Sequence, residues 1–197
     1  MIKKQQSQRE RGLTLIESAM VLALSAVVIS GVMFYYNSTA NNLALQNIEN
    51  KMMNIVEKIN ALYANQNKSG YAGLNTEIVS KFFPKGTTTV NDKGLIFTGL
   101  PGVIQVRGSA TPWNADKTGI TGPFYIIQYW FASSASRSTI TDQCVALLAN
   151  NINNPSVYSI EVNSDNDRYF KAGKVSVSEL SKTCSQPSVN GITIFYK

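Results

Sequence analysis

A polar, basic segment at the start of the chain gives way to a long apolar run. Residues 1–12 contain four basic side chains and one acid. The next 24 residues, from Leu13 to Tyr36, contain no proline and one charged side chain, that of Glu17. About 20 apolar residues are enough to cross a bilayer as a helix. A carboxylate inside such a segment is costly, so Glu17 requires a functional explanation.

Beyond this run, apolar residues recur at spacings of three and four, which predicts a single stripe on a continuing helix. The stripe consists of Leu45, Ile48, Met52, Ile55, Ile59 and Leu62. We expect it to pack the helix against the globular domain of the same chain. The polar stretch Asn37–Asn42 is weak in helix propensity, and we expect the helix to be loosened there. An unbroken helix from residue 13 to about residue 65 would be roughly 80 Å long.

Residues 66–197 contain enough sequence for one ordinary domain. Apolar runs between turn signals predict strands at 95–99, 103–107, 124–132, 157–162 and 192–196. Helices are predicted at 76–83, 141–150 and 177–182, the first with Thr76 as its N-cap and Pro84 as its stop signal. The run 124–132 is apolar at nearly every position and should be the central strand. The predicted fold class is α+β, with a long N-terminal helix packed on a mainly antiparallel sheet.

Charge and motif content exclude several classes of function. The net charge is +6, but 14 basic and 11 acidic side chains remain once residues 1–12 are set aside, without a Lys/Arg cluster. That balance argues against nucleic-acid binding. The chain has no histidine and no nucleophile-elbow, P-loop or dinucleotide motif, so we expect neither catalysis nor a cofactor. Residues 163–167 offer oxygen ligands for calcium but lack the glycine and closing glutamate of an EF-hand loop, and we expect no metal.

The apolar run admits three interpretations. It is longer than the 7–15 apolar residues typical of a secretory signal. An uncleaved membrane anchor, with its basic end in the cytoplasm, would explain the length but not the carboxylate. The third rests on the string from Gly12 and Leu13 to Glu17, which resembles the leader and N-terminal helix of a type IV pilin precursor, more like the type IVb branch. The resemblance implies that a prepilin peptidase cleaves after Gly12 and methylates Leu13, which makes Glu17 the fifth mature residue.

The chemistry of Glu17 suits that interpretation. A carboxylate in hydrocarbon is stabilised by a nearby cation, which the new amine of Leu13 would supply. Leu13 and Glu17 are four residues apart and would share one face of a helix. The pair could close within one subunit or between neighbouring subunits. The resemblance favours the second arrangement, in which the pair sets the axial register of packed helices.

Cys144 and Cys184 are the two cysteines of the chain, so one pairing is possible. They are too few and too far apart for a metal cluster. The basic leader places the domain outside the cytoplasm, where a disulfide is the expected state, although two buried thiols are the alternative. The bridge would close a loop of about 40 residues, for which the chain-entropy model gives about 4 kcal/mol. The resemblance likewise implies a disulfide-bounded C-terminal region that shapes the filament surface.

The resemblance divides the chain into a cleaved leader (1–12), a membrane-spanning and filament-core half of the helix (13–36), an amphipathic half (37–65) and a globular head (66–197). It implies a homo-oligomeric helical filament that is assembled by an inner-membrane machinery and is displayed on the surface of a Gram-negative bacterium. A minor pilin or adhesin at its tip is a further implied partner.

Leu13 at the mature start, the 12-residue leader and the remaining 185 of 197 residues are features of the type IVb branch. Within that branch the chain is most similar to the major subunits of thin conjugative pili and their enterobacterial relatives, which implies attachment or mating-pair contact. A type II secretion pseudopilin, a minor pilin and a membrane-anchored periplasmic binding domain are the alternatives.

Overall fold

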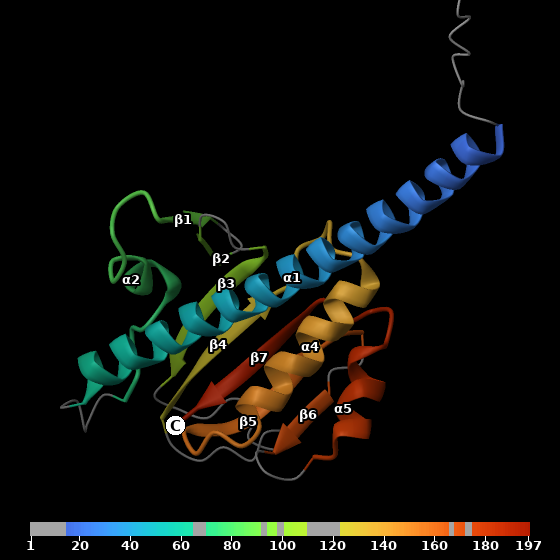
Figure 1. The fold of residues 1–197 in the computed structure, drawn as a ribbon. Coiled ribbons are helices and arrows are strands. Elements are labelled where there is room, and N and C mark those ends of the chain that lie inside the picture. The colour runs from blue at the N-terminus through green and yellow to red at the C-terminus, as the bar shows by residue number, and fades with distance from the viewer. Residues whose placement is uncertain are drawn as a thin grey trace, which may run out of the picture. The chain divides into compact units, whose positions relative to one another are not determined.

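The computed structural model describes residues 15–64, 70–91, 94–97, 101–109, 123–165, 168–171 and 175–197 (Figure 1). The chain divides into two compact units, Met1–Asn42 and Leu43–Lys197. The helix α1 (Leu15–Tyr63) contributes residues to both units. Its 49 residues correspond to about 74 Å of helix, and they confirm the long N-terminal helix that the sequence predicts.

The second unit is built on a seven-stranded antiparallel sheet with the strand order β1-β2-β3-β4-β7-β5-β6. The strands are β1 (Thr88–Asn91), β2 (Gly94–Phe97), β3 (Val103–Ser109), β4 (Phe124–Trp130), β5 (Val157–Asn163), β6 (Arg168–Lys171) and β7 (Gly191–Tyr196). The predicted antiparallel sheet and all five predicted strands are confirmed. The short outer strands β1 and β6 are additional.

Strand β4 lies in the middle of the sheet, as its apolar sequence predicts. It pairs with β3 on one side and with β7 on the other, and Ile127 stands opposite Val106 and Ile194. All three of these side chains are buried. A strand that is covered on both faces must be apolar at successive positions, which explains why β4 lacks the alternation of a half-exposed strand.

The part of the second unit that the structure describes also contains the helices α2 (Thr76–Ser80), α4 (Arg137–Asn151) and α5 (Val177–Cys184). The prediction of Thr76 as an N-cap is wrong, because Asn75 precedes the helix and its side chain accepts a hydrogen bond from Ile78 N at 3.0 Å. Helix α2 also ends before residue 83. Helix α4 begins four residues earlier than expected, because Ser136 caps it by accepting a hydrogen bond from Thr139 N at 3.2 Å.

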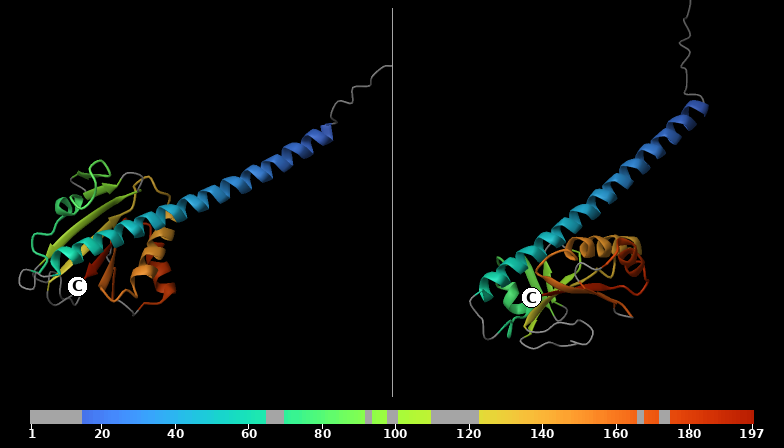
Figure 2. Two further views of the ribbon diagram at one scale, coloured as in Figure 1. Left: turned by 60° about the vertical axis from the view of Figure 1, so that its left-hand side comes forward. Right: turned by 90° about the horizontal axis from the view of Figure 1, so that it is seen from below.

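The apolar stripe of α1 packs onto the sheet as expected. Figures 1 and 2 show residues 43–63 of α1 together with α4 on one face of the sheet. Four members of the stripe are buried in the main core, namely Ile48, Met52, Ile55 and Ile59. Leu45 packs against the core, but Leu62 is 45% exposed, so the prediction is wrong for that residue. Tyr63 takes its place, with its ring centroid 5.3 Å from that of Tyr71.

Candidate functional site

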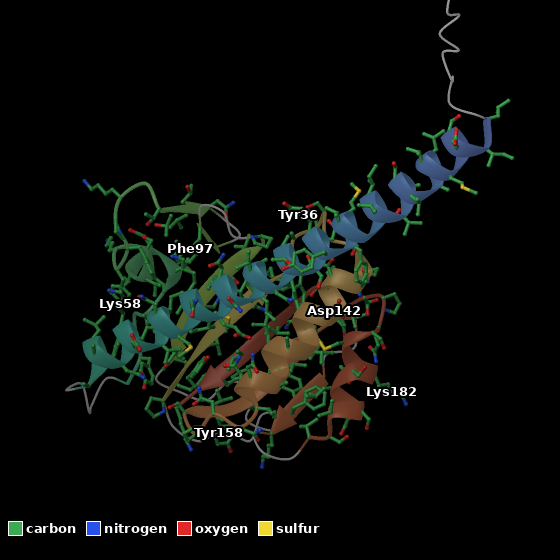
Figure 3. All side chains as sticks on the ribbon, in the orientation of Figure 1. Tyr36, Lys58, Phe97, Asp142, Tyr158 and Lys182 are labelled. Carbon is green, nitrogen blue, oxygen red and sulfur yellow. A yellow bond between two sulfur atoms is a disulfide. The ribbon has the colours of Figure 1, made fainter. Side chains whose placement is uncertain are left out.

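The first unit presents an apolar surface on α1 that is exposed in the part of the chain that the structure describes. The large apolar side chains of this stretch are exposed: Leu15, Ile16, Met20, Val21, Leu22, Leu24, Val27, Val28, Ile29, Val32, Met33, Phe34, Tyr35 and Tyr36. Figure 3 shows these side chains on the helix, with Tyr36 labelled. By length and composition, α1 is able to cross a membrane. Exposed apolar surface of this extent marks a site of contact with lipid or protein.

Two serine hydroxyls within this apolar stretch are satisfied by the helix itself. The hydroxyl of Ser25 donates to the carbonyl of Val21, and that of Ser30 donates to the carbonyl of Ala26, each at 2.7 Å. In hydrocarbon an unsatisfied hydroxyl would cost free energy, so back-bonding to the preceding turn makes these serines compatible with lipid or with a helix bundle. These hydrogen bonds were not predicted from the sequence, although a serine within an apolar helix is their usual signal.

Glu17 lies in the first turn of α1, with its side chain exposed. An acidic residue at this position interacts favourably with the partial positive charge of the helix N-terminus. Gly12 and Leu13, the residues of the predicted cleavage site, lie outside the described residues. The predicted pairing of Glu17 with the amine of Leu13 therefore stays a prediction.

Residues 37–42 continue α1 as an α-helix. The expectation that the helix is loosened there is wrong for the isolated chain. The stretch contains no proline or glycine, and its asparagine, serine and threonine residues each cost only some tenths of a kcal/mol relative to alanine.

The predicted disulfide is present and joins α4 to α5. Cys144 and Cys184 are bonded, with their Cα atoms 5.7 Å apart and 40 positions between them in sequence. Figure 3 shows the yellow sulfur atoms between the two helices. The closed segment contains β5 and β6, so the bridge fixes one edge of the sheet against two helices.

A second set of contacts near the bridge holds the segment that leads into β7. The guanidinium of Arg137 donates to the carbonyl of Val189 at 2.9 Å and to that of Gln186 at 2.5 Å. The hydroxyl of Thr141 donates to the carbonyl of Cys184 at 3.3 Å. The first turns of α4 therefore position the chain between α5 and β7. The sequence gives no signal for these contacts, because a single arginine far from its partners has no local pattern.

One oxygen of the segment 163–167 is already used within the sheet. The side-chain oxygen of Asn163 accepts hydrogen bonds from Thr193 at 3.0 Å and from Gln128 at 3.4 Å, so the sheet already uses it. Residues 166 and 167 lie outside the described residues. Among the residues that the structure describes, no group of three or more His, Cys, Asp or Glu side chains is placed to hold a metal ion.

Comparison with known proteins shows that the chain is similar to two pilus subunits. The chain is 29% identical over 199 aligned positions to the "major structural subunit of bundle-forming pilus" of Escherichia coli O111:H-, and the alignment covers 95% of each protein. The chain resembles a pilus subunit along almost its whole length. A protein with the same description from Escherichia coli O127:H6 (strain E2348/69, EPEC) is 49% identical over 70 residues, which is 36% of this chain and 35% of that protein.

No protein-family model and no solved structure matches the chain. The similarity to the pilus subunits makes the chain their homologue, and these homologues are described as structural proteins and not as enzymes. The predicted resemblance to a pilus subunit is thereby confirmed, whereas the narrower similarity to thin conjugative pili stays a prediction.

Proposed function

We propose that this chain is the structural subunit of a type IVb pilus and polymerises through the apolar half of α1 into a surface filament. The observation that carries the proposal is the uncovered apolar surface of residues 15–36, on a chain that resembles a major pilus subunit along 95% of its length. Mutual burial of apolar helix surface stabilises association by about 25 cal/mol per Å² removed from contact with water.

The precursor is processed before assembly. A prepilin peptidase cleaves after Gly12, and the new amine of Leu13 is methylated. Residues 13–36 hold the subunit in the inner membrane until it joins the filament, residues 37–65 connect this segment to the head, and residues 66–197 form the head. The length and composition of α1 and the self-satisfied serines within it support a stage in the membrane.

Glu17 sets the axial register of neighbouring helices by pairing with the N-terminal amine of another subunit. A carboxylate buried among apolar helices is costly without a cation, so only registers that supply the amine are favourable. The exposure of Glu17 in the first turn of α1 supports this role, because its carboxylate is accessible to a group from another subunit.

The subunit's partners are other copies of the chain, the prepilin peptidase, the inner-membrane assembly machinery and a minor pilin or adhesin at the tip. The filament lies on the surface of a Gram-negative bacterium and serves attachment or mating-pair contact. The two relatives described as subunits of a bundle-forming pilus support the filament itself. The choice between attachment and mating-pair contact rests on the resemblance given in the sequence analysis.

N-terminal mass spectrometry of a sheared, pelleted surface fraction tests the proposal. We expect abundant protein that begins at methylated Leu13, in visible filaments. Protein that begins at Leu13 but stays in the envelope would indicate a pseudopilin or a minor subunit. Full-length protein in the membrane beside an active peptidase would indicate an anchored periplasmic domain and would refute the proposal.

Two substitutions separate processing from assembly. Gly12→Val should leave the full-length chain in the membrane. Glu17→Ala should allow cleavage and reduce the number of filaments at least about tenfold, because each subunit loses its register contact. Ser25→Ala is the matched control, since it removes a hydroxyl that bonds only to its own helix, and should assemble normally. Normal filament numbers from Glu17→Ala would refute the register role.

A further inference from the structure

A pocket of about 280 Å³ lies between α1 and α4. Figures 1 and 2 show both helices on one face of the sheet. Helix α1 lines the pocket with two glutamates and with apolar side chains, and asparagines at the C-terminal end of α4 and the end of β7 form the other side. All of the described lining residues belong to the second unit, so the pocket is formed within that unit alone.

The two carboxylates of the pocket are those of Glu49 and Glu57, and Met53 stands between them. The three residues follow one another at intervals of four, so they form a row on one face of α1. The eight positions from Glu49 to Glu57 correspond to about 12 Å along the helix. Met53 is 63% exposed, whereas Met52, which also lines the pocket, is buried. The pocket therefore presents two negative ends with an apolar middle.

The other polar groups of the pocket offer hydrogen-bond acceptors. The side-chain amide of Asn150 donates to Glu49, which leaves the side-chain oxygen of Asn150 as an acceptor. Asn151 likewise uses its amide to donate to the carbonyl of Leu147 at 2.8 Å. None of the described residues that line the pocket is basic. The pocket therefore favours a ligand that carries positive charge and N–H donors.

Tyr196 gives an independent indication of a ligand. Its side chain lines the pocket and is 2% exposed, and its hydroxyl makes no hydrogen bond with any residue that the structure describes. Its ring stacks on that of Tyr125, with 5.0 Å between centroids, but the hydroxyl of Tyr125 has a partner in Asn60 at 3.3 Å. Buried hydroxyls are normally hydrogen-bonded, so that of Tyr196 points to a ligand that donates to it. Burial raises the pKa of Tyr196, which keeps the phenol neutral.

The spacing of the carboxylates discriminates between kinds of cation. A metal ion needs several ligands gathered around one point, and among the described residues no three His, Cys, Asp or Glu side chains are placed to hold one. Carboxylates about 12 Å apart along a helix suit positive charges that are themselves separated. A linear polyamine has this form, because methylene segments join its ammonium groups. Met53 and Val56 offer apolar surface to such segments.

We propose that the pocket between α1 and α4 binds a linear polyamine. One ammonium group pairs with Glu49 and another with Glu57, and the methylene segment between them lies against Met53. One of these ammonium groups also donates to the hydroxyl of Tyr196, because an ammonium has donors only and a neutral phenol accepts. The inference goes beyond the proposed function and does not depend on it, since a single chain supplies every described lining residue.

Equilibrium dialysis with radiolabelled spermidine tests the site on the full-length chain in micelles of an uncharged detergent. We expect one spermidine per chain. Glu49→Gln and Glu57→Gln should each weaken binding about threefold to tenfold, because each removes an ion pair. Tyr196→Phe should weaken it at least about threefold, because it removes a buried acceptor. Glu179→Gln changes an exposed glutamate of α5 outside the pocket and is the matched control, which should bind normally.

Met53→Lys is a second test that leaves every acceptor of the pocket in place. Met53 is exposed, so the substitution should not disturb the core. The new ammonium would lie between the two carboxylates and compete with the ligand, and spermidine binding should fall at least about tenfold. Leu62→Lys is the matched control, because Leu62 is a 45% exposed residue of the same helix outside the pocket. Its affinity should stay within about twofold of the wild-type value.

The outcomes separate this site from general attraction of cations. The inference is overturned if the wild type does not bind spermidine, or if either glutamine variant or Tyr196→Phe binds it as tightly as the wild type. Displacement of spermidine by an equal concentration of Mg²⁺ would show an adventitious ion site only and would also overturn it. Equal competition by n-butylamine would identify a site for a single ammonium, such as a lysine side chain, and would exclude a polyamine. Failure of the wild type to form filaments would refute the proposed function without changing any of these results.

Folding of each variant is checked by the disulfide between Cys144 and Cys184, which should be formed on a non-reducing gel. The tryptophan fluorescence spectrum should also match that of the wild type. A loss of binding in a variant that passes both checks is then a loss at the pocket.

Discussion

The packing of α1 onto the sheet can be tested with two neighbouring positions on the same helix. Ile55 is fully buried in the main core, whereas Met53 is 63% exposed. Ile55→Ala removes three carbons, which corresponds to about 2.4 kcal/mol of transfer free energy. The cavity left in a close-packed core raises the expected loss to about 3–4 kcal/mol. Met53→Ala leaves no cavity, and its loss should be within about 0.5 kcal/mol.

Urea unfolding of the full-length chain in detergent micelles, followed by tryptophan fluorescence, measures both losses. Trp130 on β4 reports on the sheet, where it is partly buried. With a slope of about 1–3 kcal/mol per M, Ile55→Ala should lower the urea midpoint by about 1–4 M while Met53→Ala leaves it nearly unchanged. Equal midpoints for the two variants would show that this part of α1 does not pack as the structure has it, and would refute the reasoning.

Three further outcomes are expected in the same assay. Cys144→Ser opens a loop of 40 residues and should cost about 4 kcal/mol, and reductant should lower the midpoint of the wild type but not that of the variant. Gly102→Ala should cost at least about 2 kcal/mol, because φ is +98° and the new Cβ would lie 2.6 Å from the hydroxyl of Tyr129. Gly73→Ala is the control. Its φ is +82° but the space around it is open, so it should cost only about 1 kcal/mol. Burial raises the pKa of Tyr125, so the folded state retains a proton that the unfolded state releases above about pH 10. The free energy of unfolding should therefore be at its full value below that pH and fall above it. The fall should be smaller in Tyr125→Phe, which has no phenol at this position.

Periodic apolar patterns made much of the fold predictable. The stripe on α1 follows from its spacing, and the central position of β4 follows from its continuous apolar sequence, because burial on one or two faces leaves a direct mark on composition. The outer strands β1 and β6 have four residues each, and β1 is largely exposed. Their strand conformation depends on pairing with β2 and β5, which no local pattern reveals.

The N-cap of α2 shows how a tertiary contact can decide between two suitable residues. Asn75 and Thr76 are both good capping residues by type. In the structure the hydroxyl of Thr76 accepts a hydrogen bond from Val106 N at 3.0 Å, which ties the helix to β3. Asn75 is then the residue that caps. The sequence predicts a helix start here but does not reveal that the threonine has a partner 30 positions away.

The continuity of α1 through residues 37–42 has a physical explanation. These residues are helical although their propensity is weak, because helix on both sides removes the cost of nucleation and only the cost of propagation remains. Five of the six residues, all except Ala40, cost some tenths of a kcal/mol each, or about 3 kcal/mol together relative to alanine, which is the same order as a few hydrogen bonds. This stretch of helix is therefore less stable than an alanine helix of the same length would be. Residues 37–42 are therefore helical because of the helix on both sides of them, whereas the segment around Ile55 is also stabilised by the core.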